Sequence, residues 1–444
     1  MTAVLQVLFS SLAGAVLSSV FACLPALHVY NVIGGLVLAL LALGNAGIVV
    51  APELYLPFMS GLIVGWSLLN TIPSVLLGAP DESAMFTVLP GQKYLMFGRG
   101  YEGAMMTGVG GLAGLFLLIF VVGPLAPLLL PVARAVLMPH MHWILWVVTT
   151  FILMSEWPKG GNRGPAGWAK FLDAWKTLAA GLLTFVLAAI LGFVLIYRSP
   201  VSVDVAFQNI MPAFVGLFAV PWCLFNLISG TKIPEQRVPD SLEADGDIVL
   251  RSAASGGLGG GFAAFFPVIT GGIGGLLAGH ATAQRDERVF LMSQGVSKLV
   301  YYVGSFLLFF VPGMNVKRGG AAWMMQSLYS PRTWGDYFMI LGSIAIAGAA
   351  AFLLMDPMTR LTLKLIRRVD YRWASAVALA ICLAIVIGLT GWMGLLVMAV
   401  STGIGSLPVL FGSRRLNCLG ILLVPMACNM SGIGAEVAHW LRLI

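Results

Sequence analysis

The sequence predicts an all-α integral membrane protein, on the strength of its composition, its few charges and its long apolar runs. Of the 444 residues, 59% are hydrophobic and 10% are charged, whereas soluble domains have about 45–50% and about 25%. A helix crosses a bilayer with about 20 apolar residues, so the chain accommodates about ten to thirteen membrane helices. This composition excludes a soluble globular protein, a disordered chain and a nucleic-acid-binding domain.

Each expected helix corresponds to an apolar run, taken in chain order. The first run has no preceding basic region and is longer than the apolar part of a signal peptide, so we expect a membrane helix there. The last two runs are short and interrupted by Gly and Pro, so they need not cross the membrane completely. The runs are 3–28, 30–50, 54–78, 103–130, 141–155, 177–197, 206–230, 253–280, 289–313, 337–355, 373–392, 394–411 and 416–435.

Residues 231–252 form the most polar stretch and lie near the middle of the chain. They predict a connecting loop between a first half of the membrane domain, residues 1–230, and a second half, residues 253–444. Two other loops, 156–176 and 356–372, are rich in Lys and Arg, and the positive-inside rule places both in the cytoplasm. The formal net charge of +7 is then explained by basic loops that orient the protein in the inner (cytoplasmic) membrane. We therefore expect a multi-pass protein without a nucleic-acid partner.

A Gly- and Pro-containing pattern occurs once in each half. A Gly-spaced apolar helix meets a proline, Pro25 or Pro267, and small polar residues and a second Gly-containing run follow. Downstream, a basic turn with Gly enters a helix at 98–106 and again at 317–325. The shared order predicts two related repeats with broken or re-entrant helices, inverted if an odd number of crossings separates them. The alternative is an accidental match between Gly-rich segments.

The two broken helices predict a binding site for an anion. A proline removes a backbone donor and disrupts the preceding turn. The helix that restarts points free N–H groups and its positive end into the bundle. The alternative is that the prolines only kink packed helices and the glycines only allow close packing. The residues expected to bind the substrate are Pro25, His28, Tyr30, Asn31, Pro267, Thr270, Gly271 and Gly272.

Two ionisable residues in apolar surroundings, Lys298 and His28, each allow two interpretations. Lys298 lies inside the run 289–313 and is expected to compensate the charge of the anion. Its alternative is a side chain that snorkels to the interface. His28 is of the type that titrates near neutral pH, and its alternative is a neutral, hydrogen-bonded interior histidine.

A block between residues 70 and 100 begins Asn70-Thr-Ile-Pro73-Ser74-Val-Leu-Leu-Gly78-Ala-Pro80 and ends Gly98-Arg99-Gly100. This block resembles the large permease of tripartite tricarboxylate transporters, the TctA family. A second run, from Arg251-Ser252 through Gly261 to Pro267, is similar to a motif in that family's second half. The first broken helix reads Pro25-Ala-Leu-His28 where the family has P-G-L-G, so the chain is more similar to divergent, stand-alone members.

The resemblance implies a secondary active transporter that moves an organic anion, a carboxylate, by alternating access. The expected partners are this small anionic substrate and membrane lipids. A homodimer, a small partner subunit and a periplasmic binding protein are left open.

Asp81 and Glu82 lie within the block of resemblance. Ionisable groups at membrane depth are costly and usually functional, so this carboxylate pair is expected to couple transport to Na⁺ or H⁺. The alternative is an ordinary aqueous loop with Lys93 and Arg99 nearby. No other cofactor is expected, and the five scattered cysteines indicate neither a disulfide framework nor a metal site.

Two further functions serve as alternatives. The run from Pro267 to Gly274 is loosely similar to a motif of polyprenyl-phosphate transporters, which would make the protein a lipid flippase that uses the same helix-end site. The residues that would then contact the lipid phosphate are Arg99, Arg318, Arg414 and Arg415. A lipid-modifying membrane enzyme is the third reading, but the sequence lacks HExxH, a supported GxSxG and GxxxxGK[ST], so we predict that it is not an enzyme.

Overall fold

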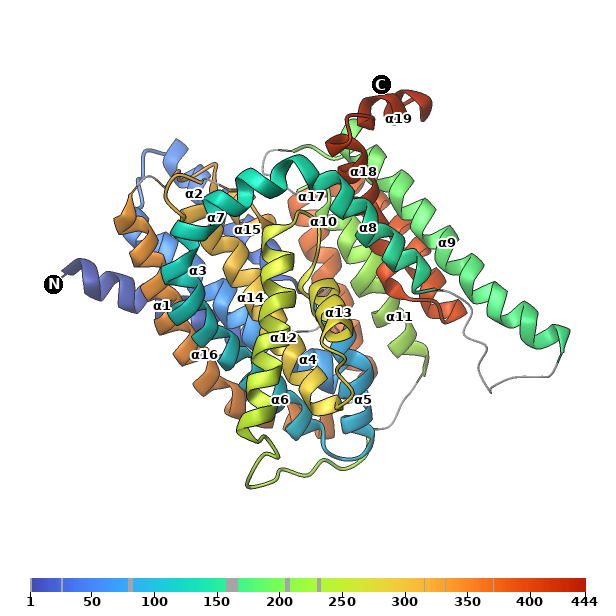
Figure 1. The fold of residues 1–444 in the computed structure, drawn as a ribbon, viewed down its shortest axis with the longest axis horizontal. Helices are drawn as coiled ribbons and strands as arrows, with labels where there is room; N and C mark the ends of the chain where they lie inside the picture. The colour runs from blue at the N-terminus through green and yellow to red at the C-terminus, as the bar shows by residue number, and fades with distance from the viewer. Residues whose placement is uncertain are drawn as a thin grey trace. The chain divides into compact units, whose positions relative to one another are not determined.

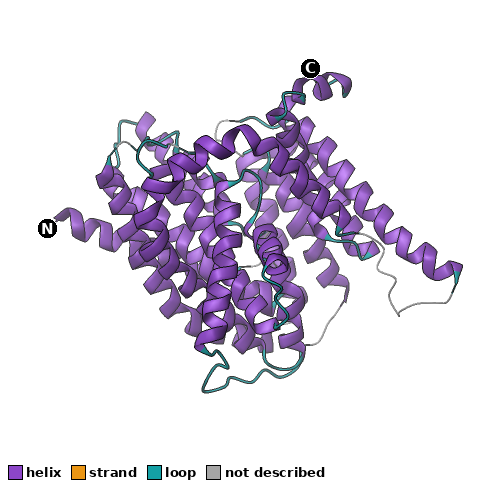
Figure 2. Cartoon of the chain, viewed as in Figure 1, coloured by secondary structure: helices purple, strands orange, loops and turns teal. Residues whose placement is uncertain are grey.

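The computed structural model describes residues 2–24, 27–78, 83–156, 167–203, 208–229, 233–314, 316–331, 333–369 and 371–444. Over these residues every regular element is a helix (Figure 2). The predicted all-α class is therefore confirmed. Three of the predicted site residues, Pro25, Asp81 and Glu82, lie outside the described residues.

The described residues contain seven helical segments that are long and apolar enough to cross a membrane. An eighth is added if the bent pair Arg415–Met430 and Gly434–Trp440 is one span. The protein is thus a multi-pass membrane protein. Two of the segments, Gly100–Met154 and Arg372–Phe411, contain 55 and 40 residues, well beyond the about 20 that one crossing needs. The expected ten to thirteen membrane helices therefore stay a prediction.

The chain folds into two compact units. Unit 1 comprises Met1–Ala133 and Asn226–Ala378, and unit 2 comprises Arg134–Phe225 and Leu379–Ile444. Each of the two predicted sequence halves contributes residues to both units. The division into repeat halves concerns sequence relationship, and it stays a prediction.

Unit 1 is built around α14, which is buried along nearly its whole length. In Figure 1, α12 and α13 lie side by side and form a helical hairpin next to α14. The elements are α1 (Thr2–Ala22), α2 (Val29–Asn45), α3 (Pro52–Leu69), α4 (Thr71–Leu76), η1 (Met85–Thr87), α5 (Val88–Met96), α6 (Gly100–Leu117), η2 (Leu118–Val122), the start of α7 (Gly123–Leu137), the end of α11 (Val220–Ser229), α12 (Gly246–Phe265), α13 (Gly271–Ala281), α14 (Glu287–Phe310), α15 (Gly319–Met325), α16 (Trp334–Arg368) and the start of α17 (Tyr371–Phe411).

Glycines let α1 pack closely on α3. A Cβ added at Gly65 would lie 2.8 Å from Ser18 Cβ and 3.1 Å from the carbonyl oxygen of Ala15. Further along, the Asn70 side chain at the end of α3 donates to the carbonyl of Ala22 at the end of α1, at 3.2 Å. Residue numbers rise together in the two helices, so α1 and α3 run parallel.

Glycines also let α12 pack closely on α14. A Cβ at Gly260 would lie 2.7 Å from the carbonyl oxygen of Ser297, and one at Gly256 would collide with the carbonyl of Ser293. These two helices also run parallel. Small residues at a membrane-helix interface allow such close backbone approach. The Gly-rich run at 256–261 therefore packs helices.

The two parallel pairs point in opposite directions. Val75, at the end of α4, contacts Gly103 at the start of α6. One buried cluster contains Met106 of α6, Ile248 of α12 and Met292 of α14, all near the starts of their helices. The end of α4, which directly follows α3, therefore lies near the starts of α12 and α14. These are the directions expected of inverted repeats, although inversion itself stays a prediction.

The polar connecting segment is fixed to unit 1 through Gln236. Its side chain is buried, accepts from Gly100 N–H at 2.8 Å and donates to the Leu95 carbonyl at 2.9 Å. Gly98, at φ 74°, leaves room for the segment, because a Cβ there would lie 2.8 Å from the carbonyl oxygen of Glu235. Arg367, near the end of α16, donates to the Gln236 carbonyl at 2.6 Å. The predicted loop is thus clamped to the turn between α5 and α6.

Unit 2 is a smaller helical unit. Gly420 packs the start of α18 on α9, where a Cβ would lie 2.6 Å from the carbonyl oxygen of Phe185. Trp146 of α8 donates to Ser431 at 3.0 Å. Its elements are the end of α7, η3 (Met138–His140), α8 (Met141–Met154), α9 (Trp168–Tyr197), α10 (Met211–Phe214), η4 (Val215–Ala219), the start of α11, the end of α17, which is kinked at Gly391, η5 (Arg415–Leu419), α18 (Gly420–Met430) and α19 (Gly434–Trp440).

Candidate functional site

The first helix break in unit 1 places His28 at the N-terminus of α2. Its Nδ1 accepts the backbone N–H of Tyr30 at 3.1 Å and caps the helix. Its Nε2 lies 3.0 Å from the hydroxyl of Tyr302 on α14. Because Nδ1 accepts, the proton of the neutral ring is on Nε2 and is donated to Tyr302. This geometry is that of a neutral, hydrogen-bonded histidine.

Aromatic rings surround His28. Ring centroids lie 4.6 Å away for Tyr30, 5.7 Å for Trp66 and 5.9 Å for Tyr302. Ser83 donates to the Tyr302 hydroxyl at 3.3 Å. The indole Nε1 of Trp66, on a side chain only 1% exposed, has no hydrogen-bond partner among the described residues. The cluster therefore holds a buried donor that a bound acceptor would satisfy.

The second break lies between α12 and α13 and contains Pro267. Thr270 caps α13 by accepting the Ile273 N–H at 3.5 Å. Gly271 abuts α14, since a Cβ there would lie 3.0 Å from Tyr301 Cβ and 3.3 Å from Lys298 Cα. The start of α13 therefore has no room for a side chain at its first residue.

Lys298 lies on α14 between the two breaks and is 1% exposed. Its ammonium donates to Asn70 Oδ1 at 2.6 Å, and Asn70 is also buried. The side chain therefore ends inside unit 1 and does not snorkel to an interface. Tyr302, four residues further on, lies on the same face of α14. About one helical turn, a rise of about 6 Å along α14, thus separates Lys298, which lies against the start of α13, from Tyr302, which is bonded to His28.

The structure brings the predicted site residues together in two groups. His28 and Tyr30 meet at Tyr302, and Gly271, which follows Thr270, meets α14 at Lys298. The other described members are near the same breaks: Asn31 is in the first turn of α2, Gly272 is in the first turn of α13, and Pro267 precedes it. Sequence reasoning missed Trp66, Asn70, Ser83 and Tyr302. Asn70 and Ser83 carried a signal, because they lie in the block of family resemblance.

Hydrogen bonds describe the surroundings of three of the four arginines assigned to a lipid phosphate. Arg99 makes two hydrogen bonds of 2.6 Å to Glu102, which raise the pKa of its guanidinium further. Arg414 donates its backbone N–H to Glu156 at 2.7 Å. Arg415 donates to the Phe218 carbonyl. The fourth residue, Arg318, precedes α15 in unit 1.

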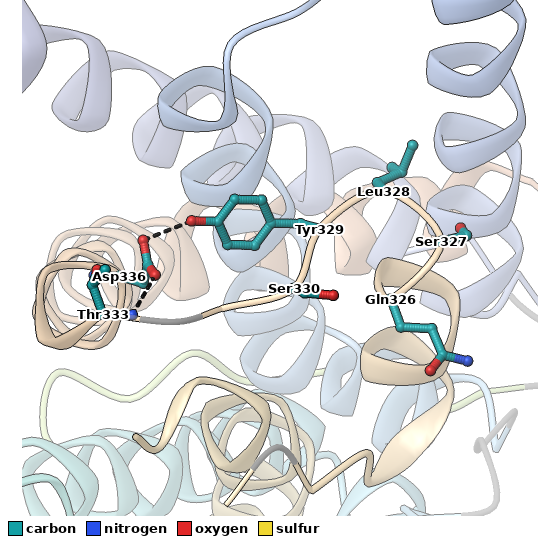
Figure 3. Close-up of a pocket in the computed structure, with 7 residues that line it drawn as sticks. All are labelled: Gln326, Ser327, Leu328, Tyr329, Ser330, Thr333 and Asp336. Carbon is teal, nitrogen blue, oxygen red and sulfur yellow. Dashed lines mark hydrogen bonds between the residues drawn. The ribbon is translucent and has the colours of Figure 1, made fainter. Parts of the chain in front are cut away.

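A pocket of about 530 Å³ opens where α15 connects to α16. Tyr329 donates to Asp336 at 2.7 Å, and Asp336 also accepts the Thr333 N–H at 3.0 Å (Figure 3). This carboxylate and burial raise the pKa of Tyr329, burial being the larger cause. The lining residues are Gln326, Ser327, Leu328, Tyr329, Ser330, Thr333 and Asp336. None of the predicted site residues is among them.

Interrupted helices that meet at a buried polar cluster, within a bundle of membrane-spanning helices, are typical of membrane transporters. Residues 8–420 match the family model described as "Tripartite tricarboxylate transporter TctA family". The chain belongs to this family, and it is a permease of the tricarboxylate-transporter type. The family resemblance predicted from the 70–100 block is therefore confirmed.

A relative is similar to the chain over nearly its full length. The uncharacterized protein MJ1079 of Methanocaldococcus jannaschii is 26% identical over 419 residues, which cover 93% of this chain and 96% of the relative. No solved structure matches the chain. Membership in a transporter family agrees with the prediction that the protein is not an enzyme.

Proposed function

We propose that the protein is a secondary active transporter of an organic anion, a carboxylate, bound between the two helix breaks of unit 1. The observation that carries the proposal is the position of α14. Within one turn of this helix, Tyr302 bonds His28 at the start of α2 and Lys298 abuts Gly271 at the start of α13. Two helix N-termini and a buried ammonium thus adjoin the same turn.

This arrangement suits a carboxylate for electrostatic reasons. The N-terminus of a helix carries a partial positive charge and free N–H donors. Lys298 adds a full positive charge, and Trp66 Nε1 adds a buried donor that needs an acceptor. A substrate with two or three carboxylates would satisfy several of these groups at once.

Alternating access is the proposed transport mechanism. The helix pairs that carry the two breaks run in opposite directions, which supports inverted repeats that open a central site to either side. The end of unit 1 where α12 and α14 begin carries the predicted cytoplasmic cluster of exposed basic residues, including Lys364, Arg367 and Arg368. We therefore propose that the α12–α13 hairpin enters from the cytoplasmic side of the inner membrane.

Asp81 and Glu82 remain the proposed ion-coupling residues. The residue that follows them, Ser83, donates to Tyr302 in the site. The proposed coupling pair is therefore adjacent in sequence to a residue that contacts the substrate cluster. The family is tripartite, so we propose that a small membrane subunit and a periplasmic binding protein are the partners to seek by copurification.

Thermal unfolding of the purified protein with a panel of ligands tests this function. A ligand that binds the native state raises the apparent Tm. We expect a di- or tricarboxylate to do so for the wild type, and His28→Ala to abolish the shift. Stabilisation by a short-chain polyprenyl phosphate alone would contradict the proposal and favour the flippase.

A further inference from the structure

We infer that Arg415 in unit 2 binds the phosphate of an anionic membrane lipid at the cytoplasmic edge of the membrane. The inference concerns a second site, in another unit than the proposed substrate site, and it goes beyond the proposed function. The lipid is a bound neighbour of the protein and not its transported substrate.

The guanidinium of Arg415 has no carboxylate partner. The side chain is partly buried at the start of η5, where it donates to the Phe218 carbonyl. Its Cζ lies 5.7 Å from the centre of the Trp222 ring. Its Nε is buried without a hydrogen-bond partner, and none of the described carboxylates forms an ion pair with it. A charge that is withdrawn from water is costly unless it is paired, so this guanidinium calls for an anion.

The neighbours of this guanidinium add a donor and positive charge. Ser413 is 8% exposed, and its hydroxyl has no hydrogen-bond partner among the described residues. The exposed ammonium of Lys176 lies 5.2 Å from the centre of the Phe411 ring. The nearby carboxylate of Glu156 is paired with Arg414, whose backbone N–H it accepts at 2.7 Å and whose Nε lies 4.0 Å away. The local excess of charge is therefore positive.

The site lies where a membrane helix meets the lipid headgroups. Thr177, near the start of α9, donates to the Phe411 carbonyl at 3.4 Å. This start of α9 belongs to the basic loop 156–176, which the positive-inside rule places in the cytoplasm. Trp168 and Trp175 in the same turns are exposed, and exposed tryptophans of membrane helices gather at headgroup level. Basic pockets between membrane helices on the cytoplasmic side bind the head groups of anionic lipids.

The chemistry of the side chain favours a phosphate. A guanidinium presents five N–H donors in a planar fork that matches phosphate oxygens. The carbonyl of Phe218 accepts from one end of this fork, and the unpartnered Nε lies on another edge. The neighbouring Leu410 is 74% exposed, so an apolar surface adjoins the charged group. A lipid supplies both the phosphate and the acyl chains that such a surface covers.

Native mass spectrometry of the purified protein in detergent, titrated with dioctanoyl phosphatidylglycerol, tests the inference. We expect the wild type to bind a first molecule of this lipid with higher affinity than further ones. We expect Arg415→Gln to weaken the first binding step about tenfold or more, because a hydrogen-bonded charge pair is lost. Arg198→Gln removes an exposed arginine at the end of α9, and this matched control should bind as the wild type does.

Two further probes separate the lipid from its parts. Dioctanoylglycerol, which lacks the phosphate, should not bind in the first step, and inorganic phosphate at the same concentration as the lipid should not displace it. Equal affinity for the lipid with and without its phosphate would overturn the inference. Displacement by inorganic phosphate would assign the site to a soluble anion and would also overturn it.

The variants decide whether Arg415 is the contact. Unchanged lipid affinity in Arg415→Gln would overturn the assignment. If that variant does not fold, Arg415→Lys keeps the charge but not the planar fork and should bind the lipid more weakly than the wild type, and equal affinity would then overturn the assignment. None of these measurements involves a carboxylate substrate, so their outcome is independent of the proposed function.

Discussion

Replacing Gly260 by Ala tests the packing that positions α14 in the site. An added Cβ would lie 2.7 Å from the carbonyl oxygen of Ser297 and 2.7 Å from Val300 Cβ, whereas ordinary contact begins at 3.4 Å. The two helices must therefore separate by about 0.7 Å, and overpacking of this kind costs about 1–3 kcal/mol. Ser297 precedes Lys298, so the shift also displaces the ammonium and should weaken carboxylate binding.

Gly261 provides a matched control in the same helix. It is exposed, and a Cβ there would meet nothing within 4 Å. Gly261→Ala gains helix propensity of up to about 1 kcal/mol without any clash. Both variants gain this propensity, so the difference between them isolates the clash. We expect the apparent Tm of Gly260→Ala to lie a few degrees below that of Gly261→Ala. Equal apparent Tm values for the two variants would refute the close packing of α12 on α14.

Three further predictions follow from hydrogen bonds in unit 1. His28→Ala removes the N-cap of α2 and should cost about 0.5–2 kcal/mol, and His28→Asn, which retains a cap, should restore most of the apparent Tm; no difference between these variants would contradict the capping role. Gln236→Ala removes two buried hydrogen bonds, including the one from Gly100 N–H, and should cost about 1–3 kcal/mol in chemical unfolding; wild-type stability would contradict the clamp. Arg288 hydrogen-bonds Asp286 and holds the pKa of that carboxyl below its usual range, so the pair stabilises the fold at neutral pH and loses its contribution as the pH falls through the lowered pKa. Arg288→Gln should therefore make the acid-side decline of the apparent Tm shallower, and an unchanged pH profile would show that the pair contributes nothing.

The sequence predicted the local features of the site and missed the distant ones. Proline and glycine change the backbone at their own positions, so the breaks that precede α2 and α13 were visible as patterns. Lys298 was visible as a charge within an apolar run. Its partner Asn70 is 228 residues away, and Tyr302 is 274 residues from His28. Such pairs depend on which helices pack together, and helical periodicity does not record that.

The division into compact units was hidden for the same reason. The polar stretch 231–252 suggested a boundary, because a change of composition often separates parts of a chain. In the structure its Gln236 is clamped to the turn before α6 and lies inside unit 1. The Gly-rich run at 256–261 lies in an apolar helix, and in the structure its glycines let α12 pack closely on α14.

Uptake of radiolabelled citrate into proteoliposomes tests the central claim most directly, namely that a carboxylate crosses the membrane through the site between the two helix breaks. The account predicts uptake by the wild type and by Lys364→Met, and none above the protein-free background by Lys298→Met or His28→Ala. Uptake by the last two variants at the wild-type rate would contradict the assignment of the site. Absence of uptake by a folded wild-type protein for every di- and tricarboxylate tried, with its partner subunits supplied, would contradict the proposed function.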